Sequence, residues 1–205
     1  MRGFDKDRAL TMFPGMRSVE CELDIYAALL TRWQARINLV SNASLANLWT
    51  RHFADSWQLV EFGSLAEHWV DLGSGAGFPG LIVALAQKHA GAGHMHAIES
   101  DARKVAFLRE VSRETGAPVT IHHGRCEDIL AEIGATVITS RAMASLEDLL
   151  DLSRWNMEKG ARALFLKGQD IGSELTQAAI SSRYLCSITP SRVDPAGSIV
   201  AISER

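Results

Sequence analysis

The sequence predicts an α/β protein built on a mostly parallel sheet with helices on both faces and an antiparallel edge. Three observations lead to this prediction. Apolar, β-favouring segments alternate with helical segments along most of the chain. A glycine-rich loop joins the first of these strands to a helix. The last two strands have no helix between them, which favours a hairpin at the sheet edge.

Composition places the chain among globular proteins. Its 205 residues are 47% hydrophobic and 22% charged, enough for one core with an extension. A net charge of −3 gives no overall attraction to nucleic acid, so RNA binding would need local basic patches. Cys21, Cys126 and Cys186 lack the spacing of a disulfide framework or a metal site, so no metal is expected. The charged start and the absence of a transmembrane-length apolar stretch predict a cytoplasmic protein without a membrane partner.

Helices are expected before the glycine loop. Residues 1–16 mix charges with a Pro-Gly pair and are expected to form a loosely ordered leader. Apolar residues at three-to-four spacing predict a helix over 18–38. A cap cluster at Ser41 opens a second helix, with Trp49, Phe53 and Trp57 along one face. We therefore divide the chain into an N-terminal helical extension, 1–66, and the α/β domain, 67–205.

His52 and Asp55 lie in this second helix, facing away from its aromatic stripe. Their spacing of three residues allows a local hydrogen bond between them.

The remaining elements follow in alternation. Strands are predicted at 69–72, 94–98, 119–122, 135–139, 161–166, 184–188 and 198–202. Helices are predicted at 81–90, 101–115, 125–133, 146–155 and 172–181. The first five strands should be parallel because a helix separates each from the next. This is a Rossmann-like arrangement, with its ligand expected where the strands end.

The glycine loop fits two cofactors. Gly75-x-Gly77-x-x-Gly80 matches the dinucleotide fingerprint, and Glu99 follows at about the 20-residue distance of a ribose-binding carboxylate, which would indicate NAD. Asp71-x-Gly73-x-Gly75-x-Gly77 is instead the acidic-then-glycine pattern of S-adenosylmethionine-dependent methyltransferases. In that interpretation Asp71 orders the loop or lies near the amino-acid end of the cofactor.

Three features favour the methyl donor. Little chain remains for a second nucleotide-binding half, and the sheet closes in a hairpin. The strand after Gly134 ends in Thr139-Ser140-Arg141, which puts polar groups at the edge where ligands of open α/β sheets bind. The Arg141 guanidinium could pair there with the methionine carboxylate or a phosphate. For Glu99, capping of the helix that follows is the alternative to binding the ribose hydroxyls.

Several motifs occur in the order typical of one family. They are Asn38-Leu39-Val40-Ser41, Arg51-His52-x-x-Asp55-Ser56, DLGSGAGFPG, Arg103-Lys104-x-x-Phe107-Leu108 and Ser140-Arg141-Ala142. From about Leu30 to Lys167 the chain resembles the bacterial small-subunit rRNA guanine-N7 methyltransferases, also called glucose-inhibited division protein B. The segment after Lys167 matches poorly.

This resemblance implies a class I methyltransferase fold and a target, N7 of guanine 527 in the 530 loop of 16S rRNA. S-adenosylmethionine contacts in the family fall on the positions matching Gly73, Phe78, Cys126, Glu127 and Arg141. Cys126 departs from the small aliphatic residues common there. From the residues alone, Phe78 could equally be core, and Cys126 and Glu127 could serve as a helix start.

The resemblance also implies pocket-lining roles for His52 and Asp55. We expect a monomer that acts on the 30S subunit or an assembly intermediate.

No general base is expected, because N7 of guanine already has a free lone pair. Catalysis should then rest on positioning and electrostatics. Some basic residues are expected to contact RNA phosphates: Arg32, Arg36, Arg51, Arg103, Lys104, Arg109, Arg113, Arg125 and Lys167. The alternatives are an NAD-binding oxidoreductase and a non-enzymatic ribosome-assembly factor that has the same fold.

Overall fold

The computed structural model describes residues 2–141, 143–168, 171–177 and 183–205. Within them, one sheet has the strand order β3-β2-β1-β4-β5-β7-β6. The strands are β1 His68–Leu72, β2 His94–Glu99, β3 Val119–His123, β4 Val137–Arg141, β5 Arg162–Lys167, β6 Tyr184–Pro190 and β7 Ser198–Glu204. Neighbours among β1 to β5 are parallel, whereas β7 is antiparallel to both β5 and β6. The predicted fold class and its antiparallel edge are confirmed.

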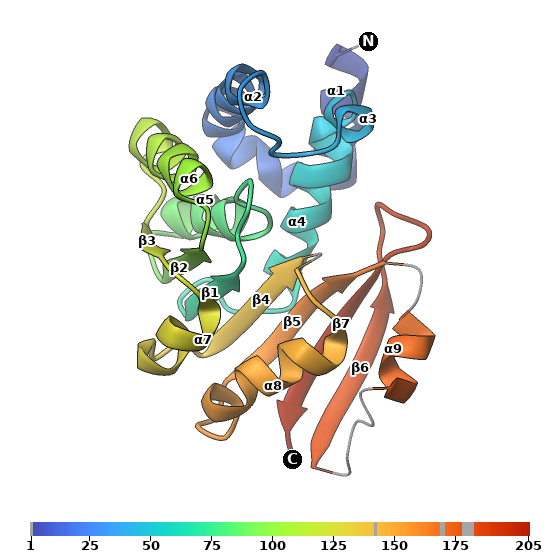
Figure 1. The fold of residues 1–205 in the computed structure, drawn as a ribbon. Coiled ribbons are helices and arrows are strands. Elements are labelled where there is room, and N and C mark those ends of the chain that lie inside the picture. The colour runs from blue at the N-terminus through green and yellow to red at the C-terminus, as the bar shows by residue number, and fades with distance from the viewer. Residues whose placement is uncertain (1, 142, 169–170, 178–182) are drawn as a thin grey trace.

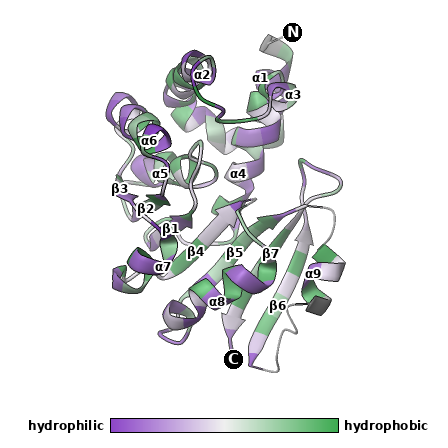
Figure 2. Ribbon diagram, viewed as in Figure 1, coloured by the Kyte–Doolittle hydropathy of each residue, from purple (hydrophilic) through white to green (hydrophobic). Residues whose placement is uncertain are grey.

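Helices cover both faces of this sheet (Figure 1). The helices after β1 are α5 Gly80–Ala90, α6 Ala102–Thr115, α7 Cys126–Ile129, α8 Leu146–Met157 and α9 Ile171–Gln177. One buried cluster joins α5 and α6 to the N-terminal helices, and a second joins α7 and α8 to the opposite sheet face. Hydrophilic and hydrophobic residues occupy different sides of α6 and α8, as expected for helices that cover a sheet (Figure 2).

The prediction of a loosely ordered leader over 1–16 is wrong. Helix α1 spans Arg2–Met12 and a 3₁₀ helix spans Pro14–Val19. The apolar side chains of Leu10, Phe13 and Met16 are buried in the first cluster. The buried Asp5 carboxylate accepts hydrogen bonds from the backbone N of Trp49 at 2.8 Å and from Thr50 Oγ1 at 2.6 Å. This segment is therefore part of the core.

The two expected N-terminal helices are present but divided. The first is α2, Glu20–Gln34. The second consists of α3 Asn42–Leu45, a π-helical turn Trp49–Ala54, α4 Asp55–Trp57 and a 3₁₀ turn Gln58–Glu61. The cap at Ser41 is confirmed, since its Oγ accepts from Ser44 N at 3.1 Å. Figure 1 shows α4 beside the tip of β4, so this helix reaches the edge where ligands are expected.

Some predicted boundaries differ from the observed ones. Strand β4 begins and ends two residues later than 135–139, and Thr139 and Ser140 are both buried strand residues. Their hydroxyls donate to Leu164 O at 2.8 Å and Leu72 O at 3.0 Å, which satisfies both polar groups inside the sheet. The predicted helix 172–181 corresponds to α9, and its positions 178–181 lie outside the described residues.

Candidate functional site: two cavities beside the glycine loop

The glycine loop leaves β1 and enters α5 through backbone conformations that favour glycine. Gly73, Gly75 and Gly77 have φ values of 61°, 56° and 89°. A Cβ at Gly77 would lie 2.4 Å from the Tyr26 hydroxyl, which donates a hydrogen bond to the carbonyl oxygen of Ala76. Helix α2 therefore packs directly on the loop and holds its shape.

Asp71 fixes the exit of the loop from within the core. Its side chain is fully buried, and Oδ2 accepts from Gly80 N, the first residue of α5, at 3.1 Å. Burial raises the pKa of this carboxyl from 3.8 to about 7, against the lowering effect of hydrogen bonds from Ser74 and Gly80. This contact ties the start of α5 to the strand before the loop.

Glu99 holds the other side of the loop from the end of β2. Its carboxylate accepts from Gly75 N at 2.7 Å and from Asp101 N at 2.8 Å. The second bond is the helix-start contact that the sequence offered as the alternative role. A carboxylate has about four lone-pair sites, so two acceptor positions remain for a ligand hydroxyl pair.

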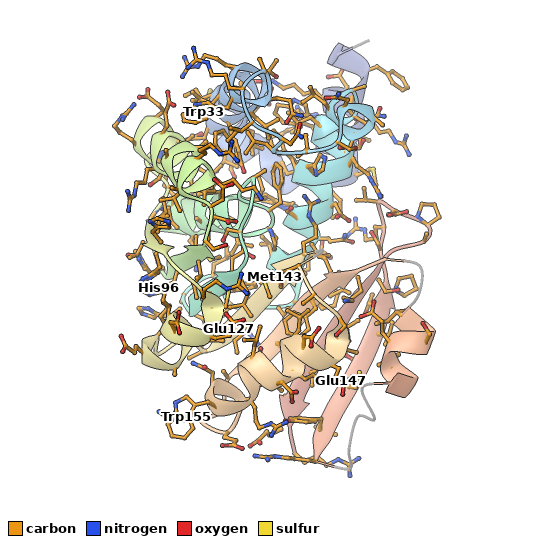
Figure 3. All side chains as sticks on the ribbon, in the orientation of Figure 1. Trp33, His96, Glu127, Met143, Glu147 and Trp155 are labelled. Carbon is orange, nitrogen blue, oxygen red and sulfur yellow. The ribbon has the colours of Figure 1, made fainter. Side chains whose placement is uncertain are left out.

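A first cavity of about 750 Å³ opens at this edge. It brings together four residues singled out from the sequence: Gly73, Glu99, Cys126 and Glu127. Sequence reasoning did not assign the other polar residues of its wall to the pocket: Ser100, Lys104, Arg125, Asp148 and Asp151. Their place in the sequence could have identified them, because each lies in the segment that follows a parallel strand. Figure 3 labels Glu127 and Met143, two lining residues on α7 and after β4.

Cys126 belongs to the wall of this cavity rather than to any nucleophilic group. Its thiol is buried, and burial raises its pKa from 9.0 to about 11. A thiol in that state is a poor nucleophile at neutral pH. Glu127 is the next residue of the wall, and it forms an exposed ion pair with Arg125 at 3.3 Å.

Arg141 lies in a second cavity, of about 340 Å³, together with His52 and Asp55. Its Nη2 lies 2.8 Å from His52 Nδ1, and its Nη1 lies 3.5 Å from Asp55 Oδ2. Arg141 therefore bridges the two helix residues, in place of the local bond expected between them. Phe78 packs beneath this group, with its ring 5.0 Å from the His52 ring and 4.9 Å from the Arg141 guanidinium. Phe78 is buried there at 3% exposure.

These contacts define the state of His52. Arginine has no acceptor, so Nδ1 must accept from Arg141, and Nε2, 2.9 Å from Ser44 Oγ, carries the proton. Burial and the charges of Arg141 and Arg51 lower the pKa of His52 to about 3. The ring is therefore neutral at physiological pH, with its lone pair already engaged.

Residues close together in sequence at and after the end of β4 line different cavities. Arg141 lines the second, whereas Met143 and Ala144 line the first. Lys167, at the end of β5, lines the second cavity and donates to Ala144 O at 2.9 Å. Seven predicted site residues thus line one cavity or the other, whereas Asp71, Gly75, Gly77 and Phe78 line neither.

Among the residues that the structure describes, no group of His, Cys, Asp and Glu is placed to hold a metal ion. Within the same residues, every helix is too short or too polar to cross a bilayer.

The strand order and the loop define a Rossmann-like fold of the methyltransferase type. A methyltransferase from Geobacter sulfurreducens superposes with a TM-score of 0.62 over 89% of each chain, at 15% identity. MtNAS in complex with S-adenosylmethionine superposes with a TM-score of 0.57 over 91% of this chain and 76% of that one, at 14% identity. Dinucleotide-binding folds have the order 3-2-1-4-5-6, without an antiparallel strand inserted beside β5.

The chain belongs to the GidB family, described as rRNA small subunit methyltransferase G, whose profile matches residues 20–194. Ribosomal RNA small subunit methyltransferase G of Bradyrhizobium sp. (strain ORS 278) is 44% identical over 200 residues, which cover 97% of this chain and 90% of the relative. The similarity extends well past Lys167, where the sequence motifs gave a poor match. The family assignment and the strand order set the NAD alternative aside.

Proposed function

We propose that this protein transfers a methyl group from S-adenosylmethionine to N7 of a guanine in 16S rRNA, at guanine 527 of the 530 loop. The observation that carries the proposal is the first cavity, in which Glu99 and Gly73 face a space at the carboxyl edge of the sheet. The relative named above is called a ribosomal RNA small subunit methyltransferase, which supports the class of substrate and the type of reaction.

The wall of the first cavity suits this cofactor. A volume of about 750 Å³ lies within the range of small-molecule pockets. The free acceptor positions of Glu99 would bind the two ribose hydroxyls, and Cys126 and Glu127 would flank the adenine. S-adenosylmethionine, when bound, supplies an electrophilic methyl group on a sulfonium. The carboxylates of Asp148 and Asp151 in the wall suit a ligand with cationic groups.

The second cavity would receive the target nucleotide. Arg141 lines this cavity and Met143, two positions later, lines the first, so we expect a base held there to approach the methyl group. N7 needs no deprotonation, and the chain offers no base to perform it at His52, whose Nδ1 accepts from Arg141. We propose that Arg141 acts here by position and charge, holding His52 and Asp55 in place and favouring an RNA phosphate nearby.

The N-terminal helices, 1–66, would help to bind the RNA. They place Arg51 and His52 in the wall of the second cavity. With a net charge of −3, naked RNA gains little overall attraction. We therefore propose that a monomer recognises the shape of the 30S subunit or of an assembly intermediate, in the cytoplasm.

Two measurements test this function. Calorimetry should detect binding of S-adenosylmethionine and no comparable binding of NAD; preferential NAD binding would overturn the proposal. Labelled methyl groups should enter 30S particles faster than protein-free 16S rRNA, and equal rates would contradict the substrate form. Cofactor binding without any incorporation would support the alternative of a non-enzymatic assembly factor.

A further inference from the structure

Asp55 is a buried carboxylate in the wall of the second cavity that the methyl-transfer chemistry does not use. Its side chain is 13% exposed. One oxygen, Oδ1, belongs to the protein framework, since it accepts from Gln58 Nε2 at 2.9 Å and Ser191 Oγ at 3.3 Å. These bonds fix the carboxylate plane from two separate parts of the chain.

The other oxygen, Oδ2, is less engaged. Among the described residues its ion-pair partner is Arg141 Nη1 at 3.5 Å, a distance longer than the ~2.7–2.9 Å of a charge-assisted hydrogen bond. Arg141 itself has a closer partner, because its Nη2 lies 2.8 Å from His52 Nδ1. Asp55 therefore presents an acceptor oxygen that is held in position and retains lone pairs for a ligand.

Guanine has the complementary donors. Its N1–H and 2-amino group point the same way from one ring edge, whereas adenine has a lone pair at N1 and no amino group at C2. N7 lies on the other ring, away from these donors, and stays free to react. We infer that Asp55 accepts hydrogen bonds from this edge and thereby selects guanine as the base to be methylated. This inference rests on the proposed function.

The arrangement of the cavities agrees with this orientation. Asp55 and Arg141 line the second cavity, and Met143 lines the first, just beyond the end of β4. A purine bound by its N1 and N2 edge at Asp55 can turn N7 toward that boundary. Asp55 is a specificity residue in this account, since it touches the base and not the reacting atom.

The test compares guanine with inosine, which lacks the 2-amino group and keeps N7. Reconstituted 30S particles carry one or the other base at the target position, and kcat/KM is measured with labelled S-adenosylmethionine. The unmodified enzyme should prefer guanine by about tenfold or more, the value of one good base contact. In Asp55→Asn this preference should fall to within about twofold of unity, because the amide oxygen keeps the framework bonds of Oδ1 and an amide nitrogen, which cannot accept, replaces Oδ2.

Asp194→Asn is the matched control. Asp194 also lines the second cavity. Its carboxylate forms an ion pair with Arg51, so it differs from Asp55, whose Oδ2 we propose for the base. This variant should keep the guanine-to-inosine ratio of the unmodified enzyme. The ratio compares two substrates of one protein, so a loss of folded enzyme cancels, and calorimetry with S-adenosylmethionine confirms that each variant is folded.

Two results would overturn the inference: equal rates on both bases for the unmodified enzyme, or an unchanged ratio in Asp55→Asn. If that variant is too slow to assay, the ratio of equilibrium affinities for the two particles replaces the rates and is interpreted in the same way. An unmodified enzyme that methylates neither particle would instead contradict the proposed function, and the inference with it.

Discussion

The buried carboxyl of Asp71 should make stability depend on pH in an unusual direction. Its Oδ2 accepts from Gly80 N, whereas its Oδ1 has no hydrogen-bond partner among the described residues. The folded pKa of about 7 lies above the ordinary value of 3.8. Between these values the folded protein keeps a proton that the unfolded chain releases, so stability falls as pH rises through this window. The full cost, present above pH 7, is at most ~4 kcal/mol at ~1.4 kcal/mol per pKa unit.

Asp71→Asn removes this titration. Asparagine can still accept from Gly80 N, and its unpaired amide adds an offset that does not change with pH. Both proteins are unfolded in urea from pH 4.5 to pH 8. Over this range the free energy of unfolding of the Asn variant, relative to that of the wild type, should rise by about 2 kcal/mol. A constant difference in unfolding free energy across this range would refute the reasoning.

Two further substitutions probe the packing that shapes the site. Gly77→Ala puts a Cβ 2.4 Å from the Tyr26 hydroxyl at a φ of 89°. It should lower the free energy of unfolding, measured in urea, by ~1–3 kcal/mol and weaken S-adenosylmethionine binding, measured by calorimetry. Unchanged cofactor affinity would show that the loop does not contact the cofactor. Asp5→Ala leaves Trp49 N and Thr50 Oγ1 without their acceptor and should cost ~1–3 kcal/mol in urea unfolding, whereas unchanged stability would show that the first helix contributes little.

The order of elements and the residues that line the first cavity were predictable because their signals are local. Gly73 and Cys126 follow strands of the parallel part of the sheet and Glu99 ends one, so the topology alone brings them to one edge. The prediction of a loosely ordered leader over 1–16 was wrong because a Pro-Gly pair and several charges are typical of loops. Its stability comes from contacts such as Asp5 with Trp49, 44 residues apart, which no local pattern records.

The division of the site into two cavities could not be predicted for the same reason. Arg141 was expected beside the cofactor because it ends a strand. Its guanidinium also contacts His52 and Asp55 on the helical segment before β1, and that segment's approach to β4 depends on tertiary packing. The position of Phe78 depends on the same packing, because its ring lies under the Arg141 guanidinium.

The most direct test of the central claim is to map the methyl group after incubating the protein with 30S particles from cells lacking this modification and labelled S-adenosylmethionine. Digestion and mass spectrometry of the 16S rRNA should yield N7-methylguanosine at guanine 527, with about one label per particle at completion. A label on another atom or base would contradict this function. So would the absence of label when the protein binds S-adenosylmethionine.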